Sequence, residues 1–166
     1  TTALLAFVLT ACSGGGGAGN VAAPTPPNPA PTPTPVAASP RFAYVANADD
    51  DTVSIYAIDA ASGSLRHNGY VNTGENPRFL AADPAGRFLF VTNNSSDELW
   101  SYAIDAATGA LTFADRIATA INPRAVAVDP LGRFVYVVNN ATHAVSAYAF
   151  DAATGALTSV GSIVTS

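Results

Sequence analysis

A segment of eight residues occurs three times in this chain in closely related form, and it limits the folds that the chain can adopt. RFLFVTNN, from Arg87 to Asn94, has near copies in RFAYVANA and RFVYVVNN, which begin 46 residues before it at Arg41 and 46 residues after it at Arg133. A helical repeat would place apolar residues about every 3.6 positions, whereas these segments are short runs rich in Val, Tyr and Phe. The period therefore predicts an all-β chain built from copies of one small sheet.

Turn residues divide each repeat into four strands. The sequences DPAG at Asp83 and DPLG at Asp129 have Asp first, Pro second and Gly fourth, which are the preferred residues of a type I turn. A second turn, DAATG or DAASG, offers a capping carboxylate and a glycine for a tight strand connection. One unit is thus strand, DPxGR turn, strand, polar loop, strand, DAATG turn, strand, and residues 77–119 form one complete copy. Such units are typical of the blades of a β-propeller.

The folded part of the chain, residues 41–166, corresponds to about 2.7 of these four-stranded blades. Propellers close with about four to eight blades, and the chain has no Met, so we expect it to be part of a longer protein. The first blade lacks its innermost strand, because Pro-rich sequence precedes Arg41 directly. In closed propellers the other end of the chain often supplies this strand, and we expect the same arrangement here.

The first 40 residues differ in composition from the rest. Residues 1–11, TTALLAFVLTA, resemble the apolar part of a bacterial export signal and are too short to span a bilayer. Leu9 to Cys12 resemble a lipobox, in which the thiol of the Cys receives a diacylglyceryl group, and Cys12 is the only Cys in the chain, so no disulfide explains it. An ordinary secretory signal with a stray Cys is the alternative. Residues 12–40 continue as a Gly-rich and then Pro-rich linker that predicts a spacer.

These N-terminal features predict an exported bacterial lipoprotein, attached to a membrane by its acyl chains without crossing it. Ser13 follows Cys12, where an Asp would be typical of lipoproteins kept in the inner membrane. The resemblance therefore implies the periplasmic side of the outer membrane or the cell surface.

The charge of the chain excludes one class of partner. The net charge is −5, and the 7 Lys and Arg residues are scattered at repeat positions. Binding to nucleic acid needs clustered cations to neutralise phosphates, so we expect no nucleic-acid partner. We also expect a monomer when the protein is full length.

The segments YVAN at Tyr44, FVTN at Phe90 and YVVN at Tyr136, together with the DPxGR and DAATGxL elements, resemble the YVTN-type repeats of the seven-bladed propeller lactonase family. That family includes the propeller-type 6-phosphogluconolactonases and the carboxymuconate cyclases. The resemblance covers residues 41–166 and implies a seven-bladed ring. It also implies hydrolysis of a lactone, although its matching residues are those that form blades rather than those that carry chemistry.

Two arginines at equivalent places are the first candidates for a site. Arg78 and Arg124 begin the inner strand of their blades, beside the expected central channel. There they could bind an anion or stabilise the oxyanion that forms when water attacks a lactone carbonyl. The alternative is that both pair with Asp or with backbone carbonyls of a neighbouring blade. Glu75 is replaced by Ile121 in the next copy, so the repeat does not require it, and it is either a general base or a solvated acid.

His143 stands where the other copies have Asp51 and Asp97, and its imidazole could exchange protons near neutral pH. Most single histidines in loops have no such role, and His67 is expected on the surface of an outermost strand. The run Asp49 to Asp51 could offer oxygen ligands to Ca²⁺, but it lacks EF-hand spacing and a solvated turn is the alternative. The sequence has no nucleophile elbow, zinc spacing or phosphate loop, so we expect no metal and no cofactor.

Two functions remain open at this point. The first is a lactone hydrolase or related lyase that uses water, one base and arginines beside the channel. The second is a propeller without catalytic activity that is displayed at the cell surface and binds a protein, a glycan or an envelope polymer. The loops and blade connections that differ between copies, such as NADDDT, NNSSDE and NNATHA, are the candidate ligand-binding face. Neutral drift of exposed loops is the alternative explanation of those differences.

Overall fold

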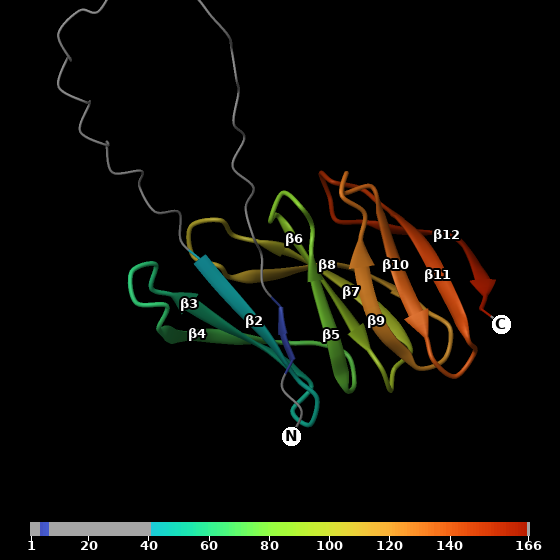
Figure 1. The fold of residues 1–166 in the computed structure, drawn as a ribbon, viewed down its shortest axis with the longest axis horizontal. Helices are drawn as coiled ribbons and strands as arrows, with labels where there is room; N and C mark the ends of the chain where they lie inside the picture. Colours follow the sequence, from blue (N-terminus) through green and yellow to red (C-terminus); the bar gives the residue numbers. More distant parts are fainter. Residues whose placement is uncertain (1–3, 7–40, 166) are drawn as a thin grey trace, which may run out of the picture.

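The computed structural model of this protein describes residues 4–6 and 41–165, which form three antiparallel sheets of four strands each (Figure 1). Blade A has β1 (Leu4–Ala6), β2 (Arg41–Asn47), β3 (Thr52–Ile58) and β4 (Leu65–Asn72). Blade B has β5 (Pro77–Ala82), β6 (Phe88–Asn93), β7 (Glu98–Ile104) and β8 (Leu111–Ala118). Blade C has β9 (Pro123–Val128), β10 (Phe134–Asn139), β11 (Ala144–Phe150) and β12 (Leu157–Val164). The predicted all-β fold and its repeating blades are confirmed.

The first strand of blade A differs from the sequence prediction. We expected this place to be filled by the other end of the chain, whereas the structure pairs Leu4–Ala6 with β2 in antiparallel register, Leu5 opposite Val45. An inner strand edge presents unpaired N–H and C=O groups, and any extended segment that reaches it can pair with them. Cys12 and the linker lie outside the described residues, so lipidation and the spacer stay predictions. None of the described residues forms a helix that could span a membrane.

The DPxGR turns join the first two strands of blades B and C. The N–H of Gly86 donates to the carbonyl of Asp83 (2.9 Å), and Oδ1 of Asp83 accepts from the N–H groups of Arg87 (2.5 Å) and Phe88 (2.8 Å). Gly86 has φ +67°, which a residue with a Cβ rarely adopts. In blade C the same bonds, led by that from the backbone N–H of Phe134, hold the pKa of Asp129 below its usual value.

The DAATG turns close the third and fourth strands in the same way in all three blades. In blade B, Oδ1 of Asp105 accepts from the N–H of Ala107 (2.9 Å) and from the N–H and hydroxyl of Thr108 (2.7 and 2.9 Å). These bonds to the charged carboxylate lower the pKa of Asp105, and equivalent bonds lower the pKa of Asp59 and Asp151. The turns are therefore fixed by their own residues, as their sequence predicts.

Because strands alternate in direction, the two kinds of turn lie at one end of the blades and the remaining connections at the other. We call the first end the turn face. The second, the loop face, carries the loops between the second and third strands (residues 47–52, 93–98 and 139–144) and the links between blades (residues 72–77 and 118–123). Loop and link are bonded to each other: the N–H of Asn94 donates to the carbonyl of Asn76 (2.9 Å), and that of Thr119 to the carbonyl of Asp97 (2.8 Å). This division agrees with the sequence prediction.

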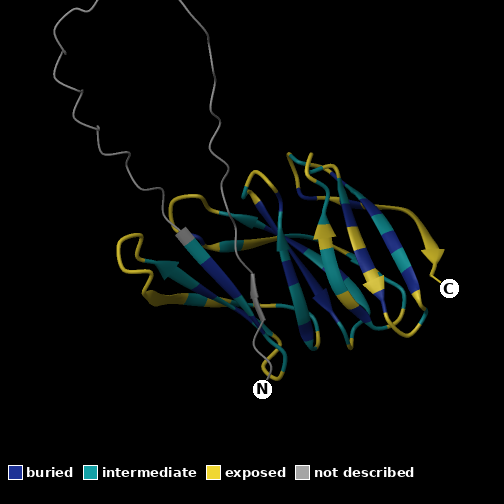
Figure 2. Cartoon of the chain, viewed as in Figure 1, coloured by how far each residue is buried: buried dark blue, intermediate teal, exposed yellow. Residues whose placement is uncertain are grey.

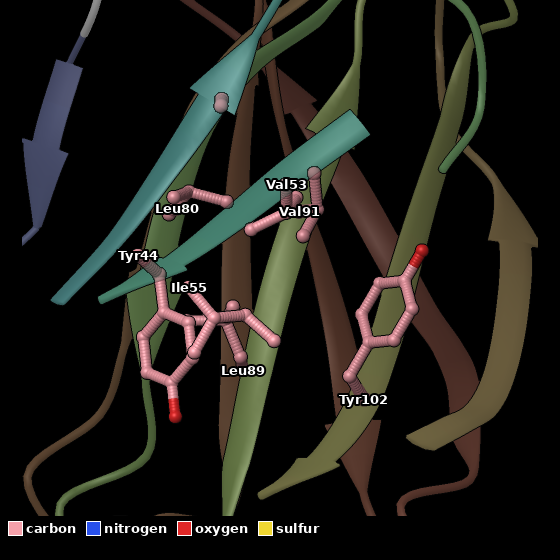
Figure 3. Packing of buried hydrophobic residues seen from close by; sticks show 8 residues of the cluster. Tyr44, Val53, Ile55, Leu80, Leu89, Val91 and Tyr102 are labelled. Carbon is pink, nitrogen blue, oxygen red and sulfur yellow. The ribbon is translucent and has the colours of Figure 1, made fainter. Parts of the chain in front are cut away.

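The core lies between the blades. Side chains of β2 and β3 interdigitate with those of β5, β6 and β7 between blades A and B, as Figure 3 shows. A second cluster joins blades B and C, where the ring of Phe150 stands edge-on to those of Phe88 and Phe90, with centroids 5.2 and 5.0 Å apart. All six residues of β6 are buried (Figure 2). Burial of both faces of the middle sheet is what stacked blades require.

Tyrosine hydroxyls add hydrogen bonds across both junctions. The hydroxyl of Tyr102 donates to the carbonyl of Asn72 at the end of β4 (2.8 Å), and that of Tyr148 to the carbonyl of Ala118 at the end of β8 (3.2 Å). Burial raises the pKa of Tyr102 to about 12, so this hydroxyl stays protonated and keeps donating at any physiological pH.

The face of blade C that points away from blade B is apolar and open. It carries a shallow groove of about 280 Å³, lined by Tyr136 and Val145 and by residues of β12 such as Val160 and Ile163. Tyr136 stands at the repeat position of Phe90, which is fully buried between blades B and C. The groove therefore lies on the side of blade C that corresponds to the side of blade B packed against blade C.

Candidate functional site

Arg78 and Arg124 lie at equivalent places on neighbouring inner strands. β5 and β9 form the inner edges of their sheets and contact each other (Figure 1). In β5 the register passes from Pro77 to Phe79, and Arg78 has no partner on β6. Arg124 is skipped in the same way between β9 and β10. Both arginines thus occupy a β-bulge, an irregularity that takes one residue out of the ladder and redirects its side chain.

Neither guanidinium is neutralised nearby. The side chain of Arg124 is exposed and that of Arg78 half-buried, and within residues 4–6 and 41–165 neither has a carboxylate within 4.0 Å or a hydrogen bond. The alternative that both pair with Asp or with carbonyls of a neighbouring blade is therefore not what the described residues show. Two unpaired cations one blade apart can attract one anionic group.

Two other arginines of the repeat have a structural role. Arg87 and Arg133 pair with the aspartates of their own DPxGR turns, Nε to Oδ2 distances of 3.7 and 3.5 Å, on the turn face. They carry the same charge as Arg78 and Arg124 but lie at the opposite end of the blades. This contrast makes the loop-face pair a candidate for function and the turn-face pair a natural control.

Glu75 lies on the link before β5, three residues before Arg78, and is exposed. Its backbone carbonyl accepts from the N–H of Ser95 (3.2 Å), which fixes the link against the loop of blade B. The carboxylate makes no ion pair among the described residues. It is free to accept a proton from a water molecule at this rim, as a general base must.

The repeat position of His143 has an architectural role in the other two blades. Asp51 and Asp97 adopt positive φ (53° each), and their Oδ1 atoms accept from the N–H groups of Asn76 (2.7 Å) and Asn122 (2.8 Å) in the following link. His143 keeps this conformation with φ +47°, and its carbonyl accepts from the N–H of Thr165 after β12. The structure therefore places His143 beside the outermost strand and does not bring it to the two arginines.

The remaining candidates are surface residues. His67 is exposed on the outermost strand β4, as predicted, and its ring packs edge-on against that of Tyr56 (centroids 5.6 Å apart). Asp49 to Asp51 form part of a turn. Within the described part of the chain, no three His, Cys, Asp or Glu side chains are grouped closely enough to hold a metal ion, and this includes the aspartate run.

Sequence reasoning missed how the links that precede the arginines are held. Asn76 and Asn122 both adopt positive φ, 55° and 63°, immediately before the proline that begins the inner strand. Nδ2 of Asn94 donates to Oδ1 of Asn122 (3.0 Å) and to the carbonyl of Pro123 (3.1 Å). The available signal was the triplet Asn-Pro-Arg, which occurs in both links although the residues before it differ.

Three antiparallel blades stacked through apolar faces, with turns at one end and links at the other, define a β-propeller. The sequence profile of the family described as lactonase, 7-bladed beta-propeller, matches residues 34–120 and 91–166. This chain belongs to that family, as its repeats predicted. A search of curated proteins found no match.

Solved structures agree with the family assignment. The periplasmic gluconolactonase PpgL of Pseudomonas aeruginosa is 28% identical, with a TM-score of 0.68 over 80% of this chain and 41% of that protein. A Bacteroides fragilis protein provisionally described as a 6-phosphogluconolactonase is 26% identical, with a TM-score of 0.69 over 75% of this chain and 39% of the other. The chain thus spans about two fifths of the length of these relatives.

Solved structures of much lower sequence identity share the fold alone. Sqt1 of Saccharomyces cerevisiae superposes with a TM-score of 0.63 over 75% of this chain and 32% of its own, at 14% identity. Such a match reports blade geometry and carries no information about chemistry.

Proposed function

We propose that this protein hydrolyses a sugar lactone or a related cyclic ester at the loop-face rim where Arg78 and Arg124 lie. The observation that carries this proposal is the repeated β-bulge, which presents an unpaired arginine at the same place in two consecutive inner strands. A blade needs no bulge there to close its turns, whereas a site for an anionic intermediate needs fixed cations. Membership of the lactonase family and the gluconolactonase relative support the same class of reaction.

The chemistry requires few groups. The oxygen of a water molecule bonds to the lactone carbonyl carbon, and the negative charge that develops on the carbonyl oxygen is stabilised by a guanidinium. The ring C–O bond then breaks, and its oxygen leaves as a hydroxyl after taking a proton. Glu75, exposed on the link that leads into Arg78, is the carboxylate to which we assign removal of the proton from the attacking water. The product is a hydroxy acid, whose carboxylate the same arginines can bind.

The test is hydrolysis of a panel of phosphorylated and unphosphorylated sugar lactones by wild type, by the Arg78→Ala/Arg124→Ala double variant and by Glu75→Gln. Loss of one oxyanion donor typically lowers kcat by about 10²–10³-fold, and we expect at least that loss from the double variant. The matched control is Arg87→Ala/Arg133→Ala, which removes the same charge from the turn face. Equal activity of the two double variants, or no turnover above the spontaneous rate by wild type, would contradict the proposal.

We further propose that the protein is exported, cleaved before Cys12 and anchored by acyl chains on that residue, which removes β1 from the mature protein and places the site outside the cytoplasm. The support is the lipobox-like sequence and the single Cys followed by a long spacer. An exported enzyme would meet unphosphorylated sugar lactones rather than phosphorylated metabolites. Mass spectrometry of the mature N-terminus, with Cys12→Ala as control, tests this; an unmodified Cys12 in the membrane fraction would overturn it.

A second function is favoured by one observation, the contrast between the nearly identical turns of the blades and their dissimilar loops on the other face. If the loop face binds a protein, a glycan or another envelope ligand without turnover, variants of Arg78 and Arg124 would weaken binding, and wild type would hydrolyse none of the lactones. Pull-down of envelope polymers with wild type and both double variants separates this function from the first.

A further inference from the structure

We infer that Asn94 is a positioning residue that sets the separation of Arg78 and Arg124. It stands in the loop between β6 and β7 and reaches both links. Its N–H donates to the carbonyl of Asn76, two residues before Arg78, and its side-chain amide donates to the carbonyl of Pro123, the residue before Arg124. One residue therefore joins the backbone that leads into the first arginine to the backbone that leads into the second.

The second link is held at a strained point. Asn122 has φ +63°, and bonds from three directions keep it there. Its N–H donates to Oδ1 of Asp97, its carbonyl accepts from the N–H of Asn140, and its side-chain oxygen accepts from Nδ2 of Asn94. Residues with a Cβ seldom adopt this conformation, and it persists only when its surroundings fix it. Without the side-chain bonds from Asn94, Asn122 keeps only its bonds to Asp97 and Asn140, and the bulge that follows it is held less tightly.

Blade A shows that this contact is not needed for folding. Ala48 occupies the repeat position of Asn94 there, and the link still forms the same turn with Asn76 at φ +55°. The cost is visible in one atom, because Oδ1 of Asn76 is buried without a hydrogen-bond partner among the described residues. The asparagine in blade B thus supplies a contact that the architecture tolerates losing, and that contact lies between the two candidate ligand-binding arginines.

The consequence for binding follows from geometry, and it rests on the proposed function of the arginines. Two guanidiniums bind one carboxylate or phosphate well only if their separation matches the anion. Movement of the link changes the separation of the two guanidinium groups without changing the charge of either. Asn94 should therefore affect affinity for anions while leaving the fold and the net charge unchanged.

The experiment compares wild type, Asn94→Ala and Asn140→Ala. The second variant removes the equivalent exposed side chain of blade C, whose described contact is made by its backbone N–H and survives the substitution. Affinity for D-gluconate and for inorganic phosphate is measured by titration calorimetry, and the Nε–H signals of Arg78, Arg124 and Arg87 are followed by NMR. We expect the Kd of Asn94→Ala to rise about tenfold, with shifted signals for the first two arginines only. Asn140→Ala should match wild type.

The outcomes separate this inference from the proposed function. If Arg78→Ala/Arg124→Ala binds both probes as wild type does, the proposed site is wrong. If that variant loses binding while Asn94→Ala binds like wild type, the site stands and the positioning role is wrong. Asn94→Asp, which keeps the size of the side chain but cannot donate, replaces the alanine variant if the latter unfolds. Wild-type affinity in a folded Asn94→Asp would likewise overturn the inference.

Discussion

The two ends of the blades are built by the same chain from the same repeat, yet they differ in how their polar atoms are satisfied. On the turn face each aspartate accepts from the backbone of its own turn, in every copy that the structure describes. On the loop face the bonds run between a loop and a link, and some of them, such as the side-chain bonds of Asn94, have no counterpart in the other described copies. Local bonds can be repeated without adjustment, whereas bonds between blades depend on two segments at once.

One substitution illustrates the difference. In blade C, Nδ2 of Asn139 donates to the hydroxyl of Ser146 (2.9 Å). In blade B the place of this serine is taken by Trp100, and Nδ2 of Asn93 is buried without a partner among the described residues. An unpaired buried donor costs about 1–3 kcal/mol. The loop face of blade B thus contains a departure from the repeat that lowers stability.

The largest effect is expected from Gly109→Ala on the turn face, compared with Gly63→Ala in the equivalent turn of blade A. Both glycines have positive φ (73° and 71°), so alanine is strained at each by about 1–2 kcal/mol. At Gly109 the new Cβ would also collide with the ring of Phe42 across the junction, whereas at Gly63 it meets open space. Overpacking adds about 1–3 kcal/mol. The free energies of unfolding of the two variants are measured by urea titration. Equal losses would contradict this prediction, because they would show that the ring of Phe42 moves aside without cost.

A smaller gain is expected from Ala48→Asn on the loop face. The new amide would stand as Asn94 does in blade B and donate to the unpaired Oδ1 of Asn76. One hydrogen bond to a buried acceptor contributes about 1 kcal/mol. The control is Ala48→Asp, which has the same size and no donor. A gain in thermal stability by the aspartate variant as large as that of the asparagine variant would refute this account.

Acidification should weaken the turn face. The pKa values of Asp59, Asp105 and Asp151 in the folded protein lie below their ordinary value of 3.8 because the ionised carboxylates accept several hydrogen bonds. Their contribution to stability is therefore present above pH 3.8 and is lost as the pH falls through the lowered values. The urea midpoint should fall between pH 6 and pH 3, and Asp105→Asn should show a smaller fall than wild type. An identical fall of the urea midpoint in wild type and in Asp105→Asn would show that Asp105 does not contribute to this pH dependence.

The smallest effect is expected from His143→Ala. The ring is exposed, and the bonds of this residue run through its backbone carbonyl. Exposed substitutions of this kind usually change stability by no more than about 0.5 kcal/mol. We expect an unchanged thermal midpoint and unchanged lactone turnover. A loss of turnover with an unchanged midpoint would return His143 to the candidate site.

More of the fold than of the candidate site could be predicted from the sequence. The order of strands in each blade and both turn types follow from residues that act locally, such as the Asp and Gly of each turn, and these predictions are confirmed. The pairing of Leu4–Ala6 with β2 was not foreseen, because any extended apolar segment can fill a strand edge. The bulges at Arg78 and Arg124 and the bonds of Asn94 were missed for a related reason. They arise where a link meets a loop from a different part of the chain, and the triplet Asn-Pro-Arg marks the place of the contact without indicating its partner.

The burial of β6 on both sides has a consequence for the motions of the molecule. Leu89 and Val91 point into the cluster with blade A, while Phe88 and Phe90 point into the cluster with blade C. Opening of either outer blade would therefore leave the other cluster intact, and only global unfolding would expose this strand. Its amide protons should exchange with solvent most slowly, and those of β4 and β12 most quickly. The middle blade is thus the part of the chain whose order lasts longest as the molecule fluctuates.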